Sequence, residues 1–298
     1  MNHSLKPIVI NAYQKVDFNP KFAANPNQFH PKQDCFDMDN HNQKAITWNE
    51  EVGYVKFFDF TIPKFQRTLL WQLDLSIYYA KLCPTNQWVW LIERNHQHKI
   101  TILLYDYQGN LLTSQSVDDD YGWAEFLITK LPENNAIMLS FAYGQDGCFD
   151  YLVKWADGKL QIQKPLDDDL SFLFCFDNNQ KAVLLNFYDS FIHITSYPDF
   201  KVLHTYQFDD EMYYDGLEKI TDTLWLFSDG MNFRYYVFNA ETRQIEKEIV
   251  IKDYEPQLND DGEIHSKISA ITYDNGKLYF CHWGEWWGVA EFNVSHLF

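Results

Sequence analysis

Short apolar runs separated by turn residues recur along the whole chain. The turns precede compact β-branched and aromatic runs such as residues 88–91 and 224–227, which have the length of strands. The turn residues are Asn42, Asn86, Asn135, Asn179, Thr223 and Asn275, and successive members lie 44, 49, 44, 44 and 52 residues apart. Self-similarity at this period predicts a repeat architecture.

A second set of turns divides each repeat again. Each of these turns lies between an aromatic-rich run and an alternating one, and almost no segment carries a sustained helical period. The second turns fall at residues 62–64, 108–110, 157–159, 198–200 and 241–243. The two sets of turns therefore predict an all-β chain in which each repeat has four strands, a to d, joined by tight hairpins.

Four antiparallel strands in a repeat of this length resemble a β-propeller blade. The resemblance implies a single domain over residues 1–298 with six four-stranded blades, and five or seven blades are the alternatives. Residues 6–13 are expected to supply the missing outer strand of the last blade, and residues 14–32 to form a connector. The Trp-Asp and Gly-His signatures of WD40 repeats are absent, so that family is not assigned. The expected blades are residues 33–74, 75–120, 121–169, 170–214, 215–261 and 262–298.

Charge narrows the classes of partner. The chain has 24 Lys and Arg against 42 Asp and Glu, a formal net charge of −18. Nucleic-acid binding needs clustered basic residues, and an anionic membrane would repel this chain, so neither is expected. The apolar start is too short for a signal peptide, no run could span a membrane, and the five cysteines form no C-x-x-C pair. We expect a cytoplasmic protein with reduced thiols.

The acidic residues cluster at predicted loops. Strands alternate in direction, so the connector after strand d and the b–c loop are expected at the same end of a blade. Some b–c loops are acidic as well, such as residues 49–51. The turns at the other end contain Lys44, Lys159 and Lys201, which predicts polarised charge. Single Asp residues are ordinary in turns, whereas runs of three in several connectors favour a functional acidic face. The alternative is that this charge serves solubility alone. The expected partner-binding residues are Asp118, Asp119, Asp120, Asp146, Asp167, Asp168, Asp169, Asp189, Asp209, Asp210, Glu211, Asp229, Glu285, Trp286 and Trp287, with Asp74, Asp260 and Asp261 as further acids of the same connectors.

Motifs of known catalytic chemistry are missing. The sequence has no Gly-x-Ser-x-Gly elbow, P-loop, dinucleotide fingerprint, His-Glu-x-x-His or calcium-loop spacing. The pair His96 and His98 is too common a pattern to predict a metal site. We therefore expect no catalytic residues, no metal and no cofactor.

Two functions remain open. In the first, the acidic, aromatic-bearing face binds a basic protein. A compact acidic protein without catalytic motifs is similar in character to the immunity proteins of bacterial toxin–immunity pairs, which implies a toxin domain, such as a nuclease, as the partner. In the second, the chain is a glycosidase- or lactonase-type hydrolase or a carbohydrate binder. Its central funnel would then use Asp146, Asp189, Asp229 and Glu285 as acid, base or cation ligands, with Trp286 or Trp287 as a stacking platform. The alternative for the tryptophans at positions 283–287 is that they pack between the last blade and the first.

Overall fold

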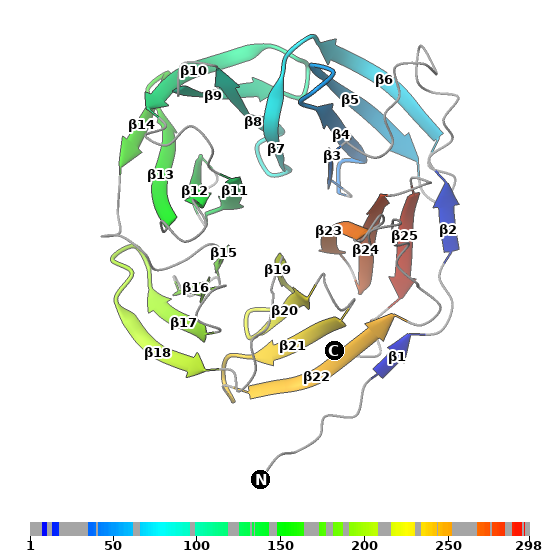
Figure 1. The fold of residues 1–298 in the computed structure, drawn as a ribbon, viewed down its shortest axis with the longest axis vertical. Helices are drawn as coiled ribbons and strands as arrows, with labels where there is room; N and C mark the ends of the chain where they lie inside the picture. Colours follow the sequence, from blue (N-terminus) through cyan, green and yellow to red (C-terminus); the bar gives the residue numbers. More distant parts are fainter. Residues whose placement is uncertain are drawn as a thin grey trace, which may run out of the picture. The chain divides into compact units, whose positions relative to one another are not determined.

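The fold is built from β-strands. The computed structural model describes residues 8–10, 14–17, 35–39, 41–61, 66–95, 99–118, 125–131, 133, 135–142, 148–163, 173–176, 181–186, 191–207, 216–229, 234–242, 244–251, 267–274, 276–283, 288–293 and 295. These residues form 25 strands in six sheets and contain no helix, so none of them lies in a helix that could cross a membrane. The predicted all-β, propeller-like fold of four-stranded antiparallel sheets is confirmed (Figure 1).

The chain divides into two compact units, and three sheets belong to unit 2, residues 16–169. Each sheet keeps its four strands in sequence order, with antiparallel neighbours. The first sheet contains β3 (Cys35–Asp39), β4 (Lys44–Asn49), β5 (Tyr54–Thr61) and β6 (Gln66–Leu73). The second contains β7 (Ile77–Cys83), β8 (Trp88–Asn95), β9 (Lys99–Asp106) and β10 (Leu111–Asp118), and the third contains β11 (Glu125–Lys130), β12 (Ala136–Ala142), β13 (Cys148–Ala156) and β14 (Lys159–Gln163).

Unit 1, residues 1–15 and 170–298, contains the other sheets. The fourth sheet contains β15 (Leu173–Phe176), β16 (Lys181–Asn186), β17 (Phe191–Ser196) and β18 (Val202–Gln207). The fifth has β19 (Gly216–Lys219), β20 (Leu224–Asp229), β21 (Arg234–Asn239) and β22 (Gln244–Ile251), with β1 (Ile8–Ile10) added at the edge of β22. The sixth has β23 (Lys267–Asp274), β24 (Lys277–Trp283) and β25 (Gly288–Asn293), and β2 (Gln14–Asp17) pairs with β25.

The N-terminal strands correct one prediction. An N-terminal strand does complete the sixth sheet, but it is β2, from the predicted connector, and not a strand from residues 6–13. Instead, β1 pairs in parallel with β22, with Ile8 opposite Ile249 and Ile10 opposite Ile251 (Figure 1). Edge pairing is made by backbone groups, so an apolar triplet can add to any accessible edge. Here it lies opposite a second apolar triplet.

Burial falls from the middle strands of a sheet to its outer strand. In the second sheet, Val89, Trp90, Leu91 and Ile92 of β8 are all at most 1% exposed, whereas β10 is mostly exposed. A strand buried on both faces is apolar throughout, and a strand at the surface carries polar residues. This gradient explains why the sequence shows continuous apolar runs for strand b and alternating patterns for strand d.

Gly109 offers a test of the packing between two sheets of unit 2. It has φ +87°, and a Cβ atom there would lie 3.0 Å from the Trp71 ring. Replacing Gly109 with Ala should lower the free energy of unfolding by about 2 kcal/mol, because positive φ and crowding both oppose a side chain. Gly158 is the matched control, with φ +74° and no atom within 4 Å of the same position. Urea titrations that show equal losses for both variants would contradict the Trp71 contact.

Candidate interaction surface

Each sheet has two distinguishable ends. In a four-stranded antiparallel sheet the chain enters and leaves at one end, the connector end, together with the loop between the second and third strands. The other end, the turn end, carries both remaining turns. In the second sheet, Asp118 and Asn95 both pair with Lys99, so the end of β10 and the β8–β9 loop share the connector end.

Like ends of the sheets of unit 2 lie on the same side of the unit. At the connector ends, the Ser76 hydroxyl after β6 donates to the Glu50 carbonyl of the β4–β5 loop, at 2.7 Å. At the turn ends, the Asn42 side-chain amide donates a hydrogen bond to the Pro84 carbonyl, at 3.0 Å. The turn ends of the second and third sheets also meet, because the Trp88 and Trp155 rings lie 4.8 Å apart, edge to face.

The connector end of the first sheet exposes carboxylates on an ordered loop. The side-chain oxygen of buried Asn49 accepts a hydrogen bond from the Val52 backbone amide, at 2.9 Å. The Asn49 backbone carbonyl accepts one from the Gly53 backbone amide, at 3.0 Å. Gly53 adopts φ +76°, which completes the tight turn. The turn leaves Glu50, Glu51 and Val52 exposed. Exposed carboxylates at this end of the first two sheets therefore include Glu50, Glu51, Asp74 and Asp118.

The local electrostatics of Glu50 show competing effects. Partial burial raises the pKa of the Glu50 carboxyl, Arg94 opposes that rise, and the Glu51 charge adds to it. The Arg94 guanidinium lies over the Tyr78 ring, 4.4 Å from its centre, in cation–π geometry. A basic group arriving at this loop would add to the stabilisation of the Glu50 carboxylate.

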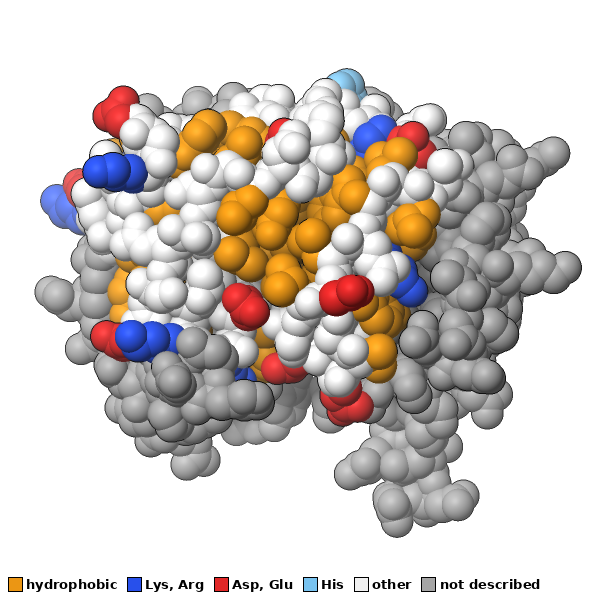
Figure 2. All heavy atoms as spheres, turned by 90° about the horizontal axis from the view of Figure 1, so that it is seen from above, with side chains coloured by type: hydrophobic (Ala, Val, Ile, Leu, Met, Phe, Trp, Pro, Cys, Tyr) orange, Lys and Arg blue, Asp and Glu red, His pale blue; other side chains and the backbone are white. Residues whose placement is uncertain are grey.

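Apolar side chains are also exposed on unit 2. Leu69 and Leu70 on β6 are 47% and 42% exposed, and Leu111 on β10 is 50% exposed. Figure 2 shows a broad area of apolar side chains on the face that it draws, with acidic side chains beside it. These side chains lie on the outer strands, and Leu111 is at the opposite end of β10 from Asp118.

Of the predicted partner-binding residues, the structure describes two. Asp118 is exposed at the connector end of the second sheet, and Asp229 is the last residue of β20, opposite Arg234. They lie in different units. The others lie outside the described residues: Asp119, Asp120, Asp146, Asp167, Asp168, Asp169, Asp189, Asp209, Asp210, Glu211, Glu285, Trp286 and Trp287.

The predicted basic character of the opposite end is wrong for the described turns. Exposed Lys159 and Lys201 are present there, but exposed Asp157 and Asp199 lie in the same two turns, and exposed Glu241 lies in the corresponding turn of the fifth sheet. Asp is favoured in turns because its side chain accepts nearby backbone amides. The turn ends therefore carry mixed charge.

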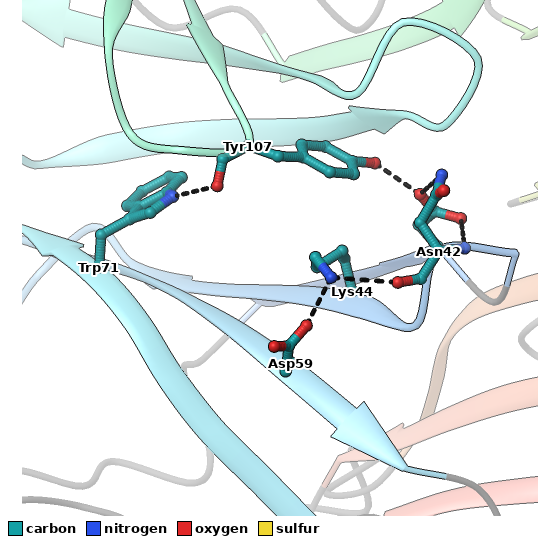
Figure 3. A network of polar contacts seen from close by, with 6 residues as sticks. Asn42, Lys44, Asp59, Trp71 and Tyr107 are labelled. Carbon is teal, nitrogen blue, oxygen red and sulfur yellow. Dashed lines mark hydrogen bonds and ion pairs between the residues drawn. The ribbon is translucent and has the colours of Figure 1, made fainter.

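Sequence reasoning missed a buried polar network at the turn ends of the first two sheets (Figure 3). Asp39, 1% exposed, accepts the Asn42 side-chain amide at 2.8 Å and the Tyr107 hydroxyl at 2.7 Å. Burial, with the Asp39 hydrogen bond and charge, raises the pKa of Tyr107, so this hydroxyl is a donor at all ordinary pH values. The Trp71 indole in turn donates to the Tyr107 carbonyl at 3.0 Å. The signal available was the alternation of Asp37 and Asp39 with apolar residues in the first strand.

A second buried carboxylate lies two residues earlier on β3. Asp37 accepts the Leu82 amide at 2.7 Å and lies 3.2 Å from the Lys81 ammonium, both on β7. Asp37 and Asp39 thus both hold the first sheet to the second. Their role is structural, since each is buried and hydrogen-bonded within the fold.

Comparisons with known proteins show the fold alone. No family model matches the chain, and no curated protein matches it. Among solved structures it is similar to Sqt1 of Saccharomyces cerevisiae (14% identity, TM-score 0.50, 86% of this chain and 83% of that one). It is also similar to a luciferin-regenerating enzyme, with 8% identity and a TM-score of 0.59 over 94% of this chain and 95% of that one. A third similar structure is a protein of unknown function from Bacteroides caccae, with 12% identity and a TM-score of 0.52 over 85% of this chain and 83% of that one. The first two are propeller-like folds.

Proposed function

We propose that this protein is a non-enzymatic binding module whose acidic connector ends bind a basic protein. The observation that carries the proposal is the placement of charge in unit 2. Like ends of its sheets lie on one side, and Glu50, Glu51, Asp74 and Asp118 are exposed there. The net charge of −18 adds long-range attraction for a basic partner.

The preferred partner is a basic toxin domain, such as a nuclease. A nuclease must carry a basic surface to bind its substrate. Carboxylates presented by ordered loops could occupy that surface in place of phosphates. The protein would then act as an immunity protein, and Asp119, Asp120 and the other predicted acids of the connectors would extend the same surface.

The six-bladed, ring-closed form of the propeller is part of this proposal. Its support is that each of the six sheets has four antiparallel strands or four with one strand added. Small-angle X-ray scattering of the purified protein should fit a closed six-bladed ring better than an open arrangement of two units.

Charge reversal tests the binding surface. The double variant Glu51→Lys and Asp74→Lys should weaken binding of the basic partner about tenfold at low salt, because opposed charges at an interface steer and stabilise association. The matched control is Glu133→Lys with Glu241→Lys, which makes the same change in net charge at exposed turn ends. The partner would be the basic protein that the wild-type chain captures from an extract of its source organism. Its affinity for each variant would be measured by calorimetry at two salt concentrations.

Two results would overturn the proposal. Equal losses for the two double variants would mean that only net charge matters. Turnover of a panel of lactones or glycosides by the purified chain, abolished by a single carboxylate substitution, would favour the hydrolase alternative instead.

A further inference from the structure

The outer strands of the first two sheets carry an uncharged surface. Residues 68–73 of β6 read Thr-Leu-Leu-Trp-Gln-Leu, and residues 111–117 of β10 read Leu-Leu-Thr-Ser-Gln-Ser-Val. Neither stretch contains Asp, Glu, Lys or Arg, although these make up 22% of the chain. Outer strands of natural sheets are commonly protected from other chains by charged side chains. That form of protection is missing from these two stretches.

Large apolar side chains are exposed on the same two strands. Leu69, Leu70 and Leu111 are 47%, 42% and 50% exposed. Among the described residues of unit 2, the one other large apolar side chain that is exposed is Val52, in the β4–β5 loop. An apolar side chain left in water contributes little to folding. The stability of the fold therefore does not explain why these leucines lie on the outer strands.

An irregularity in each outer strand lies at these leucines. The pairing of β6 with β5 passes from Leu69 to Trp71, and the pairing of β10 with β9 passes from Leu111 to Thr113. Leu70 and Leu112 are therefore extra residues at β-bulges, which bend a strand, disrupt its ladder and redirect side chains. A second chain would accordingly meet these strands through their side chains and not by continuing the sheet.

A contact between the two sheets brings the two apolar stretches together. The Trp71 indole donates a hydrogen bond to the Tyr107 carbonyl at 3.0 Å, and a Cβ atom on Gly109 would lie 3.0 Å from the Trp71 ring. Leu70 immediately precedes Trp71, and Leu111 follows Gly109 by two residues. The exposed leucines of the first and second sheets therefore flank one contact, and β6 and β10 contribute to the same surface.

We propose that this surface of β6 and β10 binds the same surface of a second copy of the chain, forming a homodimer. Charge decides the occupant. Interface cores are depleted of charged residues, and two chains of net charge −18 repel each other wherever acidic residues meet. An uncharged surface of Leu, Thr, Ser and Gln complements itself, as a two-fold interface requires. A basic protein would be attracted to the acidic connector ends instead.

Unit 1 contains a smaller surface of this kind. Val202 and Leu203 on β18 are 44% and 53% exposed, and residues 202–207 contain no Asp, Glu, Lys or Arg. The other outer strand of that unit, β22, carries Glu246, Lys247 and Glu248. Unit 2 is therefore the better candidate, because two uncharged outer strands meet there.

Sedimentation of the full-length protein over a range of concentrations tests for the dimer. Each uncharged stretch is about 20 Å long, so the interface is small and a dissociation constant of about 10–100 μM is expected. Raising the salt concentration from about 50 to 500 mM should strengthen the dimer at least threefold, because salt screens the repulsion between two acidic chains. Binding of a basic partner would weaken under the same change, so the two kinds of association are distinguishable.

Three single variants locate the interface. Leu70→Lys and Leu111→Lys should each weaken the dimer about tenfold or more, because each places a charge in an apolar contact. Val52→Lys is the matched control, since Val52 is 39% exposed in the same unit, and it should change the dimer less than twofold. Each variant makes the net charge less negative, so added repulsion between the chains cannot explain a loss. Circular dichroism would check that each variant is folded.

Four results would show that the inference is wrong. The first is a monomer at every concentration up to about 500 μM at high salt, and the second is a dimer that salt weakens. The third is an equal loss for Val52→Lys and the two leucine variants. The fourth is a dimer that is lost in Leu203→Lys and kept in Leu70→Lys and Leu111→Lys, which would place the interface in unit 1. None of these results bears on binding of a basic protein at the connector ends.

Discussion

Replacing Trp90 with Ala should lower the free energy of unfolding by about 3–5 kcal/mol. Trp90 is 1% exposed on β8 and belongs to a core cluster with Ile92, Ile102 and Leu139. These partners come from the second and third sheets, so the cavity would lie where two sheets pack. Surrounding strands held by ladder hydrogen bonds can collapse into it only partly, which places the expected loss at the upper end for a core truncation.

Leu111→Ala is the control for the Trp90 prediction. Leu111 belongs to the same sheet but is 50% exposed, so its truncation should cost less than about 0.5 kcal/mol. Urea unfolding of both variants would be followed by circular dichroism. Tryptophan fluorescence is less suitable, because the Trp90 substitution itself changes that signal. A loss below about 1 kcal/mol for Trp90→Ala would contradict its burial between the sheets.

Local strand structure could be predicted because hairpins are local. The turn residues Asn42, Asn86 and Asn135 precede β4, β8 and β12 as expected. Asn42 shows why the type of residue matters, because its backbone and side-chain amides both donate to Asp39. Turn chemistry of this kind is encoded within a few residues, so the repeat was visible in the sequence.

The destination of the N-terminal strands could not be predicted in the same way. Residues 8–10 lie far in the sequence from β22, and backbone hydrogen bonding alone does not distinguish one strand edge from another. The apolar character of Ile8–Ile10 predicted a strand, and correctly so. It did not predict which edge that strand would join.

The charge pattern was predictable in part. Antiparallel order alone places the b–c loop and the outgoing connector at one end, and Glu50, Glu51 and Asp74 follow that rule. The expectation of a basic opposite end was wrong because it counted lysines and overlooked turn-forming acids. Asp106 is one of these, since its side chain accepts the Asn110 amide at 2.7 Å. A carboxylate in a turn serves the backbone whichever end it occupies.

Replacing Asp39 with Ala should lower the free energy of unfolding by about 3 kcal/mol, because buried donors lose a charged acceptor. Asp39 receives hydrogen bonds from the Asn42 backbone, the Asn42 side chain and the Tyr107 hydroxyl. Tyr107 is 3% exposed, so water cannot readily replace the carboxylate for its hydroxyl. Tyr107→Phe should cost about 2 kcal/mol, since it removes one charge-assisted hydrogen bond and leaves two others on Asp39.

A double-mutant cycle isolates the bond that joins the two sheets. If the Tyr107 hydroxyl acts through Asp39, the Asp39→Ala and Tyr107→Phe losses should fall short of additive by about 1.5–3 kcal/mol, the range for hydrogen bonds to charged groups. Thr101→Ala with Ser116→Ala is the matched control, because their hydroxyls also pair at 3.0 Å but lie at the surface within one sheet. Additive losses at Asp39 and Tyr107 would mean that the two residues stabilise their sheets separately. The first and second sheets would then be held together by their other contacts, which include the ring contacts of Trp71 with Tyr105 and of Phe57 with Tyr107 and the Leu82–Asp37 hydrogen bond.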